Sequence, residues 1–120
     1  MKVSVRRSIS CAHQFPGEPL HGHTYRITAT VAGPVQDTGY VCTFESLREG
    51  IATICSALDH KKLEMLVTSP TTAERVALTI ARAASKAMDR IVNVRVEVGD
   101  EGYVETNLIE RDGDYFDGGN

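Results

Sequence analysis

Three of the four histidines in this chain of 120 residues lie within eleven positions of one another. They are His13, His21 and His23, and only Gly22 separates the last two. A neutral imidazole offers one ring nitrogen to a metal, and catalytic zinc is commonly held by three protein ligands with a fourth position open for water or substrate. The spacing therefore raises the hypothesis of a zinc site, provided that the fold brings the three rings together.

Two alternating segments flank these histidines and must position them. His13 ends the apolar side of residues 1–13, and His21 and His23 share the side of Tyr25 in the segment that follows. The stretch between them, QFPGEPL, has two prolines and a glycine and predicts a loop that joins an antiparallel pair. Directly opposed Cβ atoms of such a pair lie about 4.5–5.5 Å apart, so we expect the three imidazoles to converge and bind zinc. The alternative is that histidines beside a loop are solvated and have no role, which is the simpler explanation for any one of them.

Two helices follow, with a short linker at about residues 63–70 between them. A helical repeat begins after Thr43, a predicted N-cap, and its apolar positions are Phe44, Leu47, Ile51, Ile54 and Leu58. The second helix is predicted over residues 71–88, with Thr71 and Glu74 as a capping box at its start.

Two further alternating stretches, at about 94–98 and 103–109, complete the order ββααββ. We expect an α+β fold in which a four-stranded antiparallel sheet carries both helices on one face. The sheet edges then stay open, and open edges favour pairing with another copy of the chain. Residues 1–110 are expected to form a single domain, and the acidic, glycine-rich residues 111–120 are expected to fray.

Composition excludes several classes of function. A net charge of −3 argues against a nucleic-acid partner, which normally meets a basic surface. The chain has no apolar run long enough to span a membrane, and MKVSVRRSIS lacks the core of a signal peptide, so we expect cytoplasmic residence. The three cysteines are an odd number and show no paired spacing, which argues against a framework of disulfide bonds.

An ordered series of motifs runs along the chain: a His, a short loop, HGH, a G-x-V-x-x-F turn into a helix, LDH, TAE at a helix start, and a late strand with a lone Glu. This series resembles the 6-pyruvoyltetrahydropterin synthase family, which also includes 6-carboxytetrahydropterin synthase of deazaguanine (queuosine) biosynthesis. The resemblance spans residues 3 to about 105. It implies the tunnelling fold, in which the sheets of a trimer close into a barrel and two trimers stack as a hexamer.

The resemblance also implies a site and a substrate, 7,8-dihydroneopterin triphosphate. Zinc held by the three histidines would bind the side-chain hydroxyls of this pterin. Asp59 would orient His60, which would exchange protons, although the same pair could simply end a helix. Glu97 would anchor the pterin, yet it alternates with valines and could equally lie on a wet face. Thr72 would line the pterin pocket, and Lys61 would meet the triphosphate or remain solvated.

The chain departs from the family at the catalytic base. Most members carry a cysteine at the position that is Gly17 here, and Glu18 instead gives the pattern E-x-x-HGH. This resembles the variant subfamily that releases 6-hydroxymethyl-7,8-dihydropterin for folate synthesis, so we expect that product over a 6-pyruvoyl or 6-carboxy pterin. Glu18 could also be an ordinary loop charge, and Cys11 is expected to be a buried core residue rather than a thiol base. The alternative function is a homologue that binds a pterin without turnover.

Overall fold

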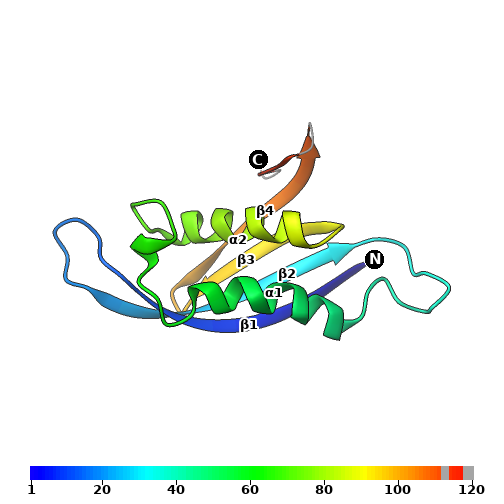
Figure 1. Ribbon diagram of the computed structural model, residues 1–120, viewed down its shortest axis with the longest axis horizontal. Helices are drawn as coiled ribbons and strands as arrows, with labels where there is room; N and C mark the ends of the chain where they lie inside the picture. The colour runs from blue at the N-terminus through cyan, green and yellow to red at the C-terminus, as the bar shows by residue number, and fades with distance from the viewer. Residues whose placement is uncertain (112–113, 118–120) are drawn as a thin grey trace.

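The arrangement of helices and strands follows the predicted order, with additions near the C-terminus. A computed structural model describes residues 1–111 and 114–117 (Figure 1). Its elements are β1 (Lys2–His13), β2 (His21–Ala32), α1 (Phe44–Leu58), a 3₁₀ turn (Leu63–Met65), α2 (Ala73–Ala87), β3 (Ile91–Val98), β4 (Gly102–Arg111) and β5 (Asp114–Asp117).

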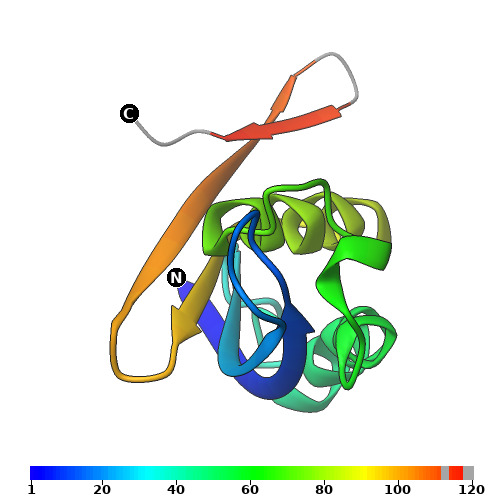
Figure 2. The same cartoon turned by 90° about the vertical axis from the view of Figure 1, so that its left-hand side faces the viewer.

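The strands form one antiparallel sheet in the order β1-β2-β3-β4-β5. Both helices cover the same face, with α1 over β1 and α2 over β3 and β4 (Figures 1 and 2). This confirms the predicted α+β architecture with its four-stranded sheet and one helical layer. On the outer edge of β1, the described residues form a single bridge, between Ala12 and Lys62. Most of that edge is therefore open to pairing, as expected.

β5 adds a short strand that the sequence did not predict. It pairs with the last four residues of β4, on the part of β4 that runs beyond the helices (Figure 2). Residues 114–117, which were expected to fray with the rest of 111–120, are therefore paired, and Arg111 closes β4. Residues 112–113 and 118–120 of that expected tail lie outside the described residues.

The core lies between the sheet and the helices and follows the strand alternation closely. Ile9, Tyr25 and Ile27 are buried on the helix-facing side, as the period of two requires. The apolar face of α1 is largely the predicted one: Leu47, Ile51 and Leu58 are buried and Cys55 is buried with them, whereas Phe44 at the first position is 58% exposed. A side chain in the first turn of a helix can extend past the layer that it begins, so helical spacing alone placed Phe44 in the core incorrectly.

The predicted N-cap is correct for α1 and one residue too early for α2. Thr43 caps α1 as predicted, since its side chain accepts a hydrogen bond from the Ser46 N–H. α2 begins one residue later than the predicted capping box, because Thr72, not Thr71, accepts from the Arg75 N–H. Glu74 then sits at the wrong position for a capping box, and the Thr71 and Glu74 side chains are available for other roles.

The stretch predicted as a linker packs against the core. The 3₁₀ turn buries Leu63 completely, and Val67 is also buried. These contacts fix the segment between the helices against β1. Among the described residues, no helix has the length and apolar character needed to cross a membrane.

Candidate active site

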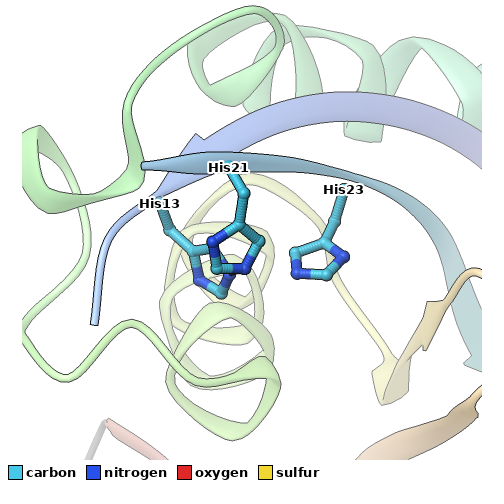
Figure 3. Close-up of side chains that lie close together, drawn as sticks. All are labelled: His13, His21 and His23. Atoms are coloured by element: carbon cyan, nitrogen blue, oxygen red, sulfur yellow. Dashed lines mark hydrogen bonds between the residues drawn. The ribbon is translucent and has the colours of Figure 1, made fainter. Parts of the chain in front are cut away.

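The β1–β2 hairpin brings the three histidines together. His13 pairs directly with His21 in the strand register, and His23 pairs with Cys11 two residues further along. All three rings project from the same face of the hairpin (Figure 3). One nitrogen from each ring can be chosen so that all three lie within 4.8 Å of one another. The predicted convergence of the imidazoles is thus present in the structure.

The hydrogen bonds of His13 and His21 determine which nitrogens carry a proton. Nδ1 of His13 lies 3.2 Å from the carbonyl oxygen of Thr71, and Nδ1 of His21 lies 3.0 Å from that of Pro19. A carbonyl oxygen only accepts, so each Nδ1 must be the N–H that donates. In the neutral rings both Nε2 atoms then present lone pairs, and these atoms lie 2.9 Å apart.

Two facing lone pairs repel unless a positive charge lies between them or beside them. Either a proton on one Nε2 or a shared cation relieves that repulsion. Zinc–nitrogen bonds of about 2.0–2.1 Å in tetrahedral geometry place ligand nitrogens roughly 3.4 Å apart. The nitrogens of His13 and His21 lie 2.9 Å apart, and all three ligand nitrogens lie within 4.8 Å of one another, so the observed distances bracket that value. The donor set of three imidazoles therefore fits a zinc ion.

His23 completes the group from the next inward position of β2. Its ring centroid lies 4.8 Å from those of both His13 and His21, in edge-to-face geometry. Partial burial, followed by the nearby imidazoles, lowers the pKa of His23, and the negative charge of Glu101 opposes that effect. A lowered pKa keeps the ring neutral at neutral pH, which is the protonation state that a metal ligand requires.

Glu64 belongs to the surroundings of His13, and sequence reasoning missed it. Its carboxylate accepts a hydrogen bond from the Thr71 hydroxyl and another, at 3.1 Å, from the backbone N–H of Gln14. Thr71 is 1% exposed and contacts Nδ1 of His13 through both its carbonyl and its hydroxyl oxygen. The linker assignment of residues 63–70 concealed this contact, since no short-range pattern relates Glu64 to His13.

A cavity of about 250 Å³ opens beside His13 and His23. Thr72 lies on it. The cavity also contains two carboxylates that the sequence analysis did not select, Glu74 from the first turn of α2 and Glu101 from the β3–β4 turn. Its full lining is His13, Phe15, His23, Tyr25, Thr72, Ala73, Glu74, Val98 and Glu101.

Asp59 and His60 lie at the edge of β1 and away from this cavity. Asp59 accepts from the Ser10 N–H at 2.8 Å, and its other oxygen lies 3.2 Å from Nδ1 of His60. The Ser10 hydrogen bond, and then His60, lower the pKa of Asp59. The His60 side chain is 81% exposed and faces a hollow of about 450 Å³ with Lys61 and Lys62.

The lining of that hollow includes Cys11 and His23 as well as residues of the opposite face of the hairpin. Ser10, Gly22 and Thr24 line it, and their positions along the strands alternate with those of the three histidines. A single chain therefore assembles the histidine cluster, and His60 and Lys61 share a hollow with His23 but do not line the cavity beside His13.

Two other expected site residues are also separate from the cluster. Glu97 lies on the outward face of β3, where its Oε2 is 3.8 Å from Nη1 of Arg26. Glu18 is exposed on the loop that joins β1 and β2. The side chain of Gln14 donates to the Glu18 carbonyl oxygen, which ties the loop to the end of β1.

Cys11 is the buried core residue that was expected. Its thiol donates to the Leu58 carbonyl oxygen at 3.2 Å. Burial raises the pKa of Cys11 to about 11. At neutral pH it remains a thiol and is poorly suited to act as a base.

Comparison with known proteins points to one group of enzymes. A family model described as 6-pyruvoyl tetrahydropterin synthase matches residues 2–108. A dihydroneopterin monophosphate aldolase of Pyrococcus furiosus is 31% identical over 97 residues, which cover 78% of this chain and 83% of that protein. An Archaeoglobus fulgidus protein with the provisional name 6-carboxy-5,6,7,8-tetrahydropterin synthase is 26% identical over 109 residues, covering 88% of this chain and 94% of that protein.

Solved 6-pyruvoyl tetrahydropterin synthases share the fold. One, from Plasmodium vivax, is a variant in which a glutamate described as catalytic is replaced by alanine. It superimposes with a TM-score of 0.69 at 20% identity, covering 89% of this chain and 98% of that chain. At that identity the likeness establishes the architecture alone.

Proposed function

This chain belongs to the 6-pyruvoyl tetrahydropterin synthase family and is a lyase-type enzyme of pterin metabolism, and we propose that it cleaves the side chain of a 7,8-dihydroneopterin phosphate. The proposed products are 6-hydroxymethyl-7,8-dihydropterin and glycolaldehyde phosphate. The name of the Pyrococcus relative, dihydroneopterin monophosphate aldolase, supports carbon–carbon cleavage over rearrangement of the side chain.

The histidine cluster is the observation that carries this proposal. His13, His21 and His23 would hold zinc through ring nitrogens, and the two facing Nε2 atoms at 2.9 Å are the feature that a cation satisfies. When bound, zinc supplies Lewis-acid polarisation of the hydroxyl groups that it touches. The adjoining cavity gives the pterin a place beside those ligands.

Glu18 is the proposed base. It removes the proton from the hydroxyl on the second side-chain carbon, which becomes the aldehyde carbon as the bond to the first carbon breaks. The electron pair of that bond moves into the pterin ring, and the first carbon then takes up a proton, so that no oxidant or water is consumed. The glutamate described as catalytic in the Plasmodium vivax enzyme supports a carboxylate in this role.

His60 is proposed to supply the returning proton, with Asp59 orienting its ring. The pair lies beside the bridge between Ala12 and Lys62 at the edge of β1, and the His60 side chain is 81% exposed. We therefore place it in the site of a neighbouring subunit, in a ring of chains closed through their free edges. A barrel of three chains, and a hexamer of two such rings, is the assembly that the fold class implies.

The pterin itself is proposed to bind in the cavity through a carboxylate. A carboxylate accepts two parallel hydrogen bonds from the amino group and ring N–H of a pterin. Glu101 and Glu74 are the carboxylates that line the cavity, together with Thr72. Glu97, which the resemblance indicated, faces the opposite side and could serve only a pocket completed there by a neighbouring chain.

The phosphate end of the substrate is proposed to meet Lys61 and Lys62 across the same subunit boundary. Both lysines are exposed around the hollow that contains His60. The hollow does not distinguish a monophosphate from a triphosphate, so both substrates belong in the assay.

A product analysis tests the proposal directly. Zinc-loaded protein is incubated with 7,8-dihydroneopterin monophosphate and, separately, with the triphosphate, and the pterins are separated by chromatography. We expect 6-hydroxymethyl-7,8-dihydropterin from at least one of them, and Glu18→Ala should lower turnover by roughly 10²-fold or more. Glu49→Ala, at an exposed position of α1, is the matched control. A 6-pyruvoyl or 6-carboxy product, or an unchanged pterin, would contradict the proposed cleavage.

A further inference from the structure

We propose that Glu64 is a positioning residue for the metal ligand His13, acting through Thr71. This inference rests on the proposed metal centre. Glu64 lies in the 3₁₀ turn between the helices, and neither the motifs nor the comparisons assign it a role. Its carboxylate reaches the Thr71 hydroxyl, which in turn lies beside the His13 ring.

The direction of the hydrogen bonds follows from the chemistry of the groups. An ionised carboxylate only accepts, so the Thr71 hydroxyl must give its proton to Glu64. The lone pairs of that hydroxyl oxygen, 3.4 Å from Nδ1 of His13, are then available only as acceptors. The Thr71 carbonyl, 3.2 Å from the same nitrogen, also only accepts.

Both neighbours therefore require an N–H at Nδ1 of His13, which leaves Nε2 free for a metal. Without Glu64, the Thr71 hydroxyl could rotate and donate its proton to Nδ1 instead. The ring would then carry its hydrogen on Nε2, where it blocks coordination. Groups that fix the tautomer of a ligating histidine in this way typically contribute a factor of 10–100 to metal affinity.

The same carboxylate also fixes the backbone next to His13. Its second oxygen accepts from the Gln14 N–H at 3.1 Å. Glu64 thus holds both the ring and the chain position that follows it. Burial raises the pKa of Glu64, but the hydrogen bonds from the Thr71 hydroxyl and from backbone N–H groups, with the charge of Lys62, together lower it below its ordinary value, so the group is ionised at neutral pH and acts as a pure acceptor.

Zinc affinity and the His13 tautomer test the inference together. Zinc dissociation constants are measured by competition with a chelator, and the ring tautomer of the metal-free protein is read from the ¹⁵N shifts of its histidine nitrogens. We expect Glu64→Ala to weaken zinc binding by about 10–100-fold and to populate the Nε2–H form of His13, whereas Thr71→Val, which has no hydroxyl to donate, should keep the Nδ1–H form that its carbonyl requires. Glu64→Gln retains an acceptor oxygen and should weaken binding less than Glu64→Ala.

Thr43→Val is the matched control for stability. It removes the N-cap hydroxyl of α1, at a cost of about 1 kcal/mol, and should leave both the zinc affinity and the tautomer unchanged. Unchanged affinity and tautomer in folded Glu64→Ala would overturn the inference, as would an equal loss of affinity in Thr43→Val. If the wild-type protein binds no zinc, the proposed metal centre fails, and the tautomer measurement alone then decides the role of Glu64.

Discussion

Replacing Glu101 by glutamine removes one negative charge from the cavity while keeping the size of the side chain. Glu101 lines the cavity together with His23 and raises the pKa of that ring. If its carboxylate accepts the amino group and ring N–H of the pterin, glutamine can replace only one of those two contacts. We therefore expect Glu101→Gln to bind pterin more weakly without loss of the fold.

The expected size of the effect follows from the lost contact. A hydrogen bond to a charged group contributes about 1.5–3 kcal/mol, which corresponds to a rise of roughly 10–150-fold in the dissociation constant. Removing Glu101 also removes the charge that opposes the lowering of the His23 pKa. The pKa of His23 in the metal-free variant should therefore fall further, which gives a second readout by NMR.

Glu97→Gln is the matched control on the opposite face of the sheet. It breaks an exposed ion pair in which Nη1 of Arg26 is 3.8 Å from the carboxylate, and such a pair contributes at most about 1 kcal/mol to stability. Titration of both variants with 6-hydroxymethyl-7,8-dihydropterin, followed by fluorescence, should show weaker binding only for Glu101→Gln. Weaker binding only for Glu97→Gln would refute the cavity assignment and restore the residue that the resemblance indicated.

Three further predictions concern the metal, a thiol and a carboxylate. Zinc at about a hundred times its dissociation constant should stabilise the protein by about 2.7 kcal/mol, which corresponds to an increase of roughly 10 °C in Tm for a chain of this length. Calorimetry should show no such increase in Tm for His21→Ala. An equal increase in that variant would place the metal elsewhere. Cys11, whose pKa burial raises to about 11, should resist iodoacetamide in the native protein at pH 7.5 by mass spectrometry; a loss of roughly a hundredfold in turnover for Cys11→Ala would instead make it a base. The Ser10 hydrogen bond lowers the pKa of Asp59, so the stabilisation that ionised Asp59 provides is complete above about pH 4 and is lost as the pH falls through the pKa of the folded state. Urea unfolding should show that the free energies of unfolding of wild type and Asp59→Asn become more similar in that acid range. A difference in free energy that does not change with pH would contradict this.

The sheet and the histidine cluster were predictable because strand parity is a strict constraint. Once His13 and His21 are placed at the two ends of one hairpin, a period of two decides which face each ring occupies. The register in the structure pairs these two residues directly. The same reasoning correctly placed Cys11 in the core.

The surroundings of the cluster were not predictable in this way. Glu64 reaches Thr71 across the connection between the two helices, and Glu101 reaches the cavity from a turn between strands. Both placements depend on how loops cross in three dimensions, where sequence periodicity carries no information. The resemblance indicated Glu97 because it is the glutamate within the late strand, yet at that position the strand alternation directs it outward.

Metal content tests the central claim most directly. Protein loaded with zinc, dialysed against metal-free buffer and analysed by mass spectrometry for zinc and protein should contain about one zinc ion per chain. The double variant His21→Ala/His23→Ala should retain almost none. A wild-type protein without zinc, or a double variant that keeps as much as wild type, would contradict the assignment of the three imidazoles as a metal centre.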